Sequence, residues 1–388
     1  MTVPLAHSGL AANHLMRLAV EETGLSDFGD LWFTPHLRKL IDALITEGHL
    51  KADGLEIMRR RFVAFLATRL RLQEQLKRHP EILSERIAAP IIIIGLPRTG
   101  TTKLQRMMAA SGDFSYLPLW QALDPISTDQ SSASERASRT DAGRKYVAML
   151  KEHAPEVMAV HEMDADEPEE EIMLMQHSFL TKVVYAEAHI PTFLDWVDRA
   201  DCRPVYRELS EWLRYIQWQN GGRRKRWLLK CVYHNEFLEQ LLEVFPDARL
   251  VQLHRDPAKV IGSWCGLVEV FRKVYRDDNN PWEIGPDTLQ YWKTIMDRNL
   301  DIRRRRPEIT VKDFLFTDVV ADIDKVITAI YAFADIPLTS EACSRMTRWA
   351  TANQQYKHGR YDYSLEKFGL DSATVYSSFS TYRDLYKV

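Results

Sequence analysis

Short apolar runs separated by helical patterns dominate the chain from residue 90 onward. Four of them have the length and composition of buried strands: "PIIIIG" at 90–95, "RWLLKC" at 226–231, "RLVQLHRDP" at 249–257 and "ITVKDFLF" at 309–316. Strands that are apolar on both faces are typical of a parallel sheet covered by helices on each side. The pattern therefore predicts an α/β fold with a parallel sheet flanked by helices.

The first 88 residues show a helical pattern instead. In "GLEIMRRRFVAFLATRLRLQEQL" the apolar residues recur at close to helical spacing, with arginines between them: Leu55, Met58, Phe62, Phe65, Leu66, Leu70 and Leu72. We expect residues 1–88 to form an N-terminal helical cap and residues 89–388 to form the α/β domain.

A long helical insertion, roughly residues 113–225, separates the first two predicted strands. It contains the polar run "STDQSSASERASRTDAGR" at 127–144, which predicts a mobile loop, and the acidic run "DADEPEEE" at 164–171. It also carries methionines and aromatic residues suited to a pocket for an apolar ligand. Methionines at helical spacing are more often part of a plain core.

Composition and charge exclude several classes of protein. The 388 residues are 45% apolar and 10% aromatic, with a formal net charge of −3, which is ordinary for a large globular protein. This charge gives no overall attraction to nucleic acid or to an anionic membrane, so any anion must be bound by local groups. Four cysteines without a CxxC pair suit buried thiols in a reducing cytosol: Cys202, Cys231, Cys265 and Cys343.

No targeting or membrane segment is evident. The N-terminal residues lack the basic and apolar regions of a secretory signal, and no apolar run approaches the roughly 20 residues of a membrane span. We expect a cytoplasmic protein without a transmembrane segment. Peripheral contact with a membrane stays open, since the arginine runs at 223–226 and 303–306 are either solvated surface or sites for an anion.

The chemistry-bearing stretch is "GLPRTGTT", residues 95–102, between a buried strand and a helical pattern. A strand, a glycine loop and a helix in this order wrap backbone N–H groups around an anion and point a helix N-terminus at it. Gly95 and Gly100 have the spacing of the phosphate loop of nucleotide triphosphatases, but Thr101 stands where that loop needs lysine. No apolar strand ends in a lone aspartate that holds magnesium. We therefore expect a phosphate-like group bound without a metal.

A second anion site is indicated by "DARLVQLHRDPAKVIGSW". Arg255 follows a strand directly, and Ser263 lies eight positions further along the next helix, about two turns away. A guanidinium and a hydroxyl so placed can grip one phosphate group together. Two anion sites at the ends of parallel strands indicate a nucleotide with phosphate at both ends, bound where the strand order reverses.

These two motifs resemble those of the sulfotransferases. "PIIIIGLPRTGTTKL" is similar to their 5′-phosphosulfate loop, and "LVQLHRDPAKVIGSW" is similar to their 3′-phosphate motif. Further stretches, among them "LPLWQALDP", "ADEPEEEIML" and "HGRYDYSLEKFGL", fall in the order of a bacterial branch of the family. The resemblance covers nearly all of the chain and implies a P-loop-like fold.

The resemblance implies the donor 3′-phosphoadenosine-5′-phosphosulfate and no metal, since a sulfuryl group is less negatively charged than a γ-phosphoryl group. Arg98 stands where cytosolic members have lysine, which implies contact with the bridging or sulfuryl oxygens. The residues implied to hold the 5′-phosphate are Thr99, Gly100, Thr101 and Thr102. Those implied to hold the 3′-phosphate are Arg255 and Ser263.

The general base has three candidates. Lys230 and His234, four positions apart, approximately match the lysine and histidine that follow the corresponding strand in cytosolic sulfotransferases, where the spacing is Lys-x-His. The resemblance implies a catalytic role for both residues. His161 precedes the acidic run, whose own carboxylates are the third choice: Glu169, Glu170 and Glu171. Each has a structural alternative, since His234 can pack under the sheet and the glutamates can form the acidic first turn of a helix.

The resemblance implies an acceptor that carries a hydroxyl on a lipid, sterol, polyketide or aromatic small molecule. Two other classes stay open. A small-molecule kinase shares the strand, loop and helix arrangement but needs ATP, magnesium and the missing lysine. A non-catalytic nucleotide-binding protein would keep the fold without a base.

Overall fold

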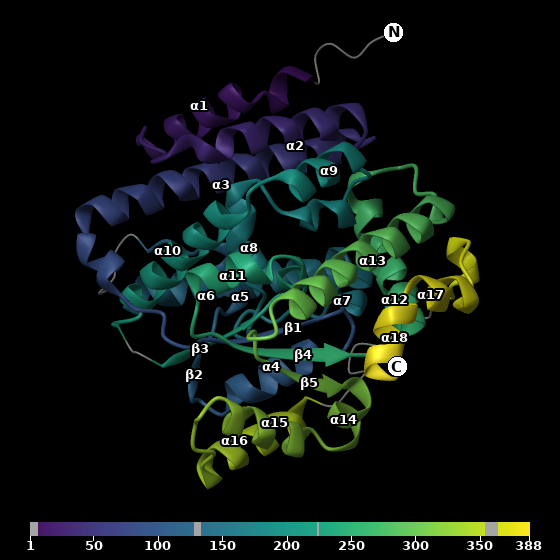
Figure 1. The fold of residues 1–388 in the computed structure, drawn as a ribbon. Helices are drawn as coiled ribbons and strands as arrows, with labels where there is room; N and C mark the ends of the chain where they lie inside the picture. Colours follow the sequence, from purple (N-terminus) through teal and green to yellow (C-terminus); the bar gives the residue numbers. More distant parts are fainter. Residues whose placement is uncertain (1–6, 128–132, 223–224, 354–363) are drawn as a thin grey trace.

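In the part of the chain that it describes, the computed structural model has one sheet of five strands with helices packed around it (Figure 1). Two features expected from the sequence fall partly outside the described residues: the arginine run at 223–226 and the motif at 358–370. The structure describes residues 7–127, 133–222, 225–353 and 364–388.

The sheet is entirely parallel, with strand order β2-β3-β1-β4-β5. Its strands are β1 (Ile91–Gly95), β2 (Phe114–Ser115), β3 (Arg226–Lys230), β4 (Arg249–His254) and β5 (Val311–Leu315). After β1 the chain builds the β3 side of the sheet and then returns to place β4 on the other side of β1. The order reverses between β1 and β4, so the loops that follow these two strands lie side by side.

The four consecutive isoleucines of β1 face both sides of the sheet. Ile92 and Ile94 belong to the large apolar core beneath the upper helices, whereas Ile91 and Ile93 belong to a second core on the opposite face. All four are fully buried. Because side chains alternate along a strand, a run that is apolar at every position is what a strand covered on both faces requires.

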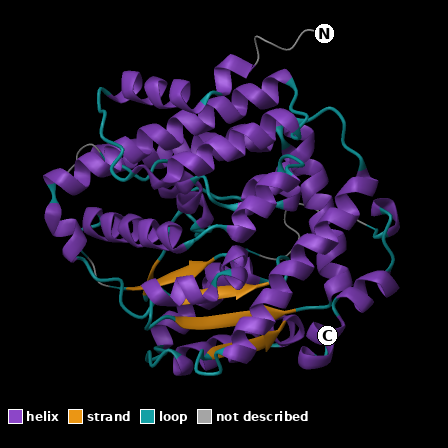
Figure 2. Cartoon of the chain, turned by 45° about the horizontal axis from the view of Figure 1, so that its top comes forward, coloured by secondary structure: helices purple, strands orange, loops and turns teal. Residues whose placement is uncertain are grey.

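Helices cover both faces of the sheet, as Figure 2 also shows. One face is covered by α4 (Thr101–Ala110), α15 (Ile323–Phe333) and α16 (Ser340–Ala352). The other face carries the N-terminal helices α1 (Ala12–Thr23), α2 (Thr34–Thr46) and α3 (Ala52–Arg78), together with α10 (Arg203–Gln219), α11 (Leu238–Val244), α12 (Pro257–Tyr275) and α13 (Pro281–Arg305). One continuous apolar core joins α1 to α3 with the face of the sheet.

The remaining helices lie in the insertion between β2 and β3 and at the C-terminal end. They are α5 (Leu119–Leu123), α6 (Ala133–His153), α7 (Pro155–Val160), α8 (Ile172–Met175), α9 (Pro191–Arg199), α14 (Phe316–Ala321), α17 (Ser372–Ser378) and α18 (Ser380–Tyr386). None of the helices in the described ranges is both long and apolar enough to cross a membrane.

The expected mobile loop at 127–144 is wrong where the structure describes it, because α6 covers most of that run. The residues that this helix buries are Arg139, Gly143 and Val147, which lie four positions apart. Gly143 lies against Trp120, since a Cβ at position 143 would come within 2.6 Å of the Trp120 Cβ atom. The Arg139 guanidinium lies 5.1 Å from the centre of the same indole ring, where a cation is attracted to the π face.

Two smaller expectations also need correction. Strand β2 has only two residues and was not among the four predicted strands, because so short a run carries no alternation. Three cysteines are buried as expected, but Cys343 is exposed.

Candidate active site

The loop that follows β1 is built around left-handed backbone. Gly95, Arg98 and Gly100 have φ angles of 130°, 63° and 88°. Glycine is required at position 95, because a Cβ atom there would lie 2.4 Å from the Leu253 carbonyl oxygen on the neighbouring strand β4. Left-handed residues in such a loop turn successive N–H groups toward one concave site, and the N-terminus of α4 adds its own N–H groups.

The residues predicted to bind the two phosphate groups lie in the loop after β1 and in the segment after β4, and they contact one another directly. The Arg98 Nε donates to Ser263 Oγ at 3.1 Å, and the Arg255 Nη1 donates to the Arg98 carbonyl oxygen at 2.6 Å. Arg98 also donates to the Val160 carbonyl oxygen at the end of α7, at 3.0 Å. The Arg255 guanidinium lies 4.0 Å from the centre of the Phe316 ring. Residues from three elements therefore converge on one cationic site at the switch point.

The hydroxyls of the loop differ in what they can do. The Thr99 side chain is fully buried, and its hydroxyl donates to the Leu96 carbonyl oxygen at 2.7 Å, so this residue offers an anion only its backbone N–H. Thr101 is also buried, whereas Thr102 is partly exposed. The Lys230 ammonium donates to the Thr102 hydroxyl at 3.4 Å, which places a cation from β3 beside the start of α4.

Three consecutive glutamates diverge toward three different partners. Glu169 lies 3.6 Å from His161, Glu170 accepts a hydrogen bond from the Lys230 ammonium at 2.5 Å, and Glu171 binds His234 at 2.7 Å. They precede α8 and do not form its first turn. Just before the glutamates, Pro168 forms an isolated antiparallel bridge with Pro118, which directly precedes α5. The structure thus brings Lys230, Glu170 and Thr102 together.

Glu169 is held as an ion. Burial raises the pKa of its carboxyl group, but attraction to the nearby His161 ring and Lys230 ammonium outweighs burial and brings the pKa to about 2. One Glu169 oxygen also accepts from the Glu170 backbone N–H at 2.9 Å. A carboxylate with so low a pKa has little affinity for a proton at neutral pH. His161 is one-third exposed and lies beside this carboxylate.

His234 lies in the interior. Its side chain has no exposed surface, and it belongs to a short 3-10 helix, Val232–Glu236, directly after β3. Both ring nitrogens have protein partners, Glu171 at Nε2 and the Tyr206 hydroxyl at Nδ1, the latter at 3.0 Å. The Glu170 side chain, by contrast, is 16% exposed. The residues that enclose His234 therefore prevent a ligand from contacting its ring.

The sequence did not single out the residues that support Arg255 from behind. The Tyr382 hydroxyl accepts a hydrogen bond from the Arg255 backbone N–H at 3.2 Å, and the Tyr376 hydroxyl donates to Asp256 at 3.2 Å. Both tyrosines lie on the C-terminal helices α17 and α18. The clustering of tyrosines at the end of the chain is the one signal that could have pointed to them.

Architecture and loop geometry together define a P-loop-like α/β protein. Comparison with known proteins gives the family: residues 90–340 match the sulfotransferase family. The chain is also 23% identical over 287 residues to omega-hydroxy-beta-dihydromenaquinone-9 sulfotransferase Stf3 of Mycobacterium bovis and of Mycobacterium tuberculosis, an alignment that covers 72% of this chain and 71% of the relative.

Two crystal structures share the whole architecture. Sulfotransferase STF9 from Mycobacterium avium is 26% identical with a TM-score of 0.86, covering 97% of both chains. Sulfotransferase STF1 from Mycobacterium tuberculosis is 28% identical with a TM-score of 0.83, covering 96% of this chain and 98% of that one. The chain belongs to the sulfotransferase family.

Proposed function

We propose that this sulfotransferase moves a sulfuryl group from 3′-phosphoadenosine-5′-phosphosulfate to a hydroxyl of a small, apolar acceptor, with Glu170 as the general base and without a metal. The observation that carries the proposal is the convergence of Arg98, Arg255 and Ser263 on one side of the glycine loop with Lys230 and Glu170 on the other. A donor held by the first group would present its sulfuryl end to the second.

The proposed chemistry is an in-line displacement with a loose transition state, in which positioning and charge stabilisation dominate. Glu170 takes the proton of the acceptor hydroxyl as the acceptor oxygen attacks sulfur, and the bond from sulfur to the 5′-phosphate oxygen breaks. Lys230, beside Thr102, offsets the charge that develops on that phosphate oxygen. Arg98 would stabilise the charge on the sulfuryl oxygens.

Glu170 is preferred over the other two candidate bases for physical reasons. His234 is fully buried with both nitrogens occupied, so an acceptor hydroxyl cannot reach it without displacing the residues around it. Glu169 binds protons too weakly. His161 remains the alternative, because one-third of its side chain is exposed. A base must lie within hydrogen-bond reach of the proton that it removes.

The donor is tested by calorimetry with the product 3′-phosphoadenosine-5′-phosphate. We expect it to bind in the absence of magnesium, and we expect ATP with magnesium to bind much more weakly, because the loop lacks the lysine and the metal ligand of an ATP site. Tighter, magnesium-dependent binding of ATP would contradict the proposal.

Arg255→Ala should weaken binding of 3′-phosphoadenosine-5′-phosphate by about 10- to 100-fold, since a hydrogen bond to a charged group contributes about 1.5–3 kcal/mol. Calorimetry measures this directly. A matched control is Arg304→Ala, which removes an exposed arginine paired with Asp301 on α13 and should leave the affinity unchanged. Equal effects of the two substitutions would show that net charge, not a phosphate contact, governs donor binding.

The acceptor is found by screening hydroxylated compounds with labelled sulfate donor. The mycobacterial relative is named for a menaquinone that carries a hydroxyl, so long apolar molecules with a terminal hydroxyl are the first to test. Labelled product with apolar alcohols, and none with polar sugars or nucleosides, is the expected result. Transfer to polar acceptors alone would exclude the apolar class.

A further inference from the structure

Glu171 joins the candidate catalytic pair to the interior of the protein. One of its carboxylate oxygens accepts a hydrogen bond from the Lys230 backbone N–H at 2.9 Å, and the other lies 2.7 Å from the His234 Nε2 atom. Neither Glu171 nor His234 has any exposed side-chain surface. The two neighbouring glutamates therefore hold the same lysine at two points, Glu171 at its main chain and Glu170 at its ammonium.

The Lys230 backbone N–H needs this partner because of where β3 ends. The Cys231 N–H donates to the Ile93 carbonyl oxygen of β1, so the N–H of Lys230 points to the opposite side of the strand. On that side β2 pairs only with Arg226 and Trp227. A buried backbone N–H without a partner is costly, and the Glu171 carboxylate takes the place that a longer β2 would fill.

We place the ring proton of His234 on Nε2, where it faces the Glu171 carboxylate. Glu171 accepts at both oxygens, so the His234 Nε2 carries the hydrogen that faces it. The Nδ1 atom is then the acceptor for the Tyr206 hydroxyl, 3.0 Å away. The hydrogen-bonded chain runs from the Tyr206 hydroxyl through the His234 ring to the Glu171 carboxylate, which also accepts from the Lys230 backbone N–H.

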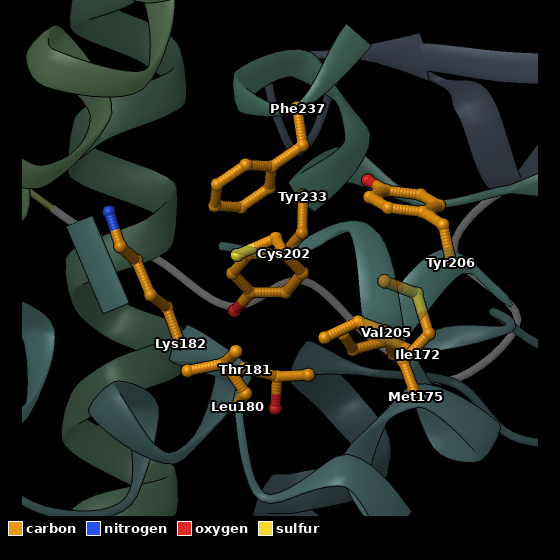
Figure 3. Close-up of a pocket in the computed structure, with 10 residues that line it drawn as sticks. All are labelled: Ile172, Met175, Leu180, Thr181, Lys182, Cys202, Val205, Tyr206, Tyr233 and Phe237. Atoms are coloured by element: carbon orange, nitrogen blue, oxygen red, sulfur yellow. The ribbon is translucent and has the colours of Figure 1, made fainter. Parts of the chain in front are cut away.

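Largely apolar side chains surround the Tyr206 end of this hydrogen-bonded chain. Tyr206 lines a small internal cavity (Figure 3). A cavity of about 10 Å³ holds at most one water molecule and cannot accept a substrate. Half of its ten lining residues have wholly apolar side chains: Ile172, Met175, Leu180, Val205 and Phe237.

We propose that Glu171 is the positioning residue for the Lys230 and Glu170 pair, and that His234 and Tyr206 hold its carboxylate in place. The inference rests on the proposed function, in which Glu170 is the base. Glu171 has no exposed surface and touches no acceptor, so it acts through Lys230. Its charge makes the bond to the backbone N–H stronger than a neutral acceptor would. A displacement of about 1 Å at a catalytic pair can cost about 10²-fold in rate.

Two substitutions of Glu171 test separately the length and the charge of its side chain. Glu171→Asp keeps the charge but is too short to bridge Lys230 and His234, and Glu171→Gln keeps the length but loses the charge. We expect each to lower kcat by about 10-fold or more, with the affinity for 3′-phosphoadenosine-5′-phosphate within about threefold of the parent enzyme. A kcat within threefold of the parent for either variant, or a donor affinity that falls as far as kcat, would overturn the inference.

A smaller change, Tyr206→Phe, tests the proposal in case the Glu171 variants fail to fold. Tyr206→Phe removes only the hydroxyl that faces His234 Nδ1, and we expect it to lower kcat about three- to tenfold at unchanged donor affinity and circular dichroism. An unchanged kcat overturns the proposal. If instead Glu170→Gln keeps its activity while these variants lose theirs, the base assignment has failed and the positioning role has not.

Nuclear magnetic resonance tests the proton assignment independently of activity. In protein with ¹⁵N-labelled histidine, the signal of His234 is identified as the one lost in His234→Gln. In the parent enzyme this signal should be that of a neutral ring protonated at Nε2. In Glu171→Gln the new amide can donate to Nε2, so the ring should be protonated at Nδ1 instead. A charged ring, or one protonated at Nδ1 in the parent enzyme, overturns the assignment.

Discussion

Glu170→Gln is expected to lower kcat by about 10²–10⁴-fold, the usual contribution of general-base catalysis. Glutamine keeps the shape of the side chain and an oxygen that can accept from the Lys230 ammonium, which lies 2.5 Å from Glu170, but an amide does not take up the acceptor proton. Donor affinity should stay within a few-fold of the parent enzyme, because the proposed donor contacts come from other residues. Steady-state kinetics with saturating donor and calorimetry measure the two quantities.

Matched substitutions decide which group is the base. Glu156→Gln changes an exposed glutamate of the nearby helix α7 and should retain full activity. His161→Asn should cost less than Glu170→Gln. If His161→Asn abolishes turnover while Glu170→Gln retains at least a third of it, the base is the histidine, and Glu170 serves only to balance the buried Lys230 charge.

The sheet was predictable from the sequence because its strands carry a local signal. Four isoleucines in a row have no polar face, so they fit only a strand covered on both sides, and the structure confirms this with Ile92 and Ile94 on one face and Ile91 and Ile93 on the other. The glycine loop followed by a helix was equally local. The expected parallel sheet and the expected sulfotransferase family are both confirmed.

Elements whose stability comes from distant contacts were not predictable. The α6 run is rich in serine, threonine, arginine and aspartate, which is typical of a loop. It folds as a helix because Gly143 and Arg139 pack on Trp120, a residue about twenty positions earlier. Tertiary packing overrides weak local preference in such a segment.

The assignment of the base depended on contacts that no spacing reveals. The ring of His234 is enclosed by Glu171, 63 positions earlier, and by Tyr206, 28 positions earlier. The sequence placed His234 near the end of a strand, where catalytic groups gather, but could not indicate which side of the strand it faces. Likewise, only the folded structure shows that three adjacent glutamates bind three different partners.

The contacts that Arg98 makes within the protein affect what its substitution is expected to do. Its guanidinium now donates to Ser263 Oγ at 3.1 Å and to the Val160 carbonyl oxygen at 3.0 Å. In the proposed complex Ser263 binds the 3′-phosphate and Arg98 turns to the sulfuryl group. Donor binding must therefore exchange the contact between Arg98 and Ser263 for contacts with the ligand.

Arg98→Ala is expected to lower kcat by about 10²–10³-fold, the usual cost of removing one donor that stabilises transition-state charge. Donor affinity should change little, since the substitution releases the Ser263 hydroxyl that Arg98 now engages and so offsets part of the lost contact. Single-turnover rates at saturating donor and calorimetry with 3′-phosphoadenosine-5′-phosphate separate the two effects. Arg98→Lys, which keeps the charge without the planar fork, should lie between alanine and the parent enzyme. Equal losses in rate and affinity would instead show that Arg98 binds the ground state and the transition state alike.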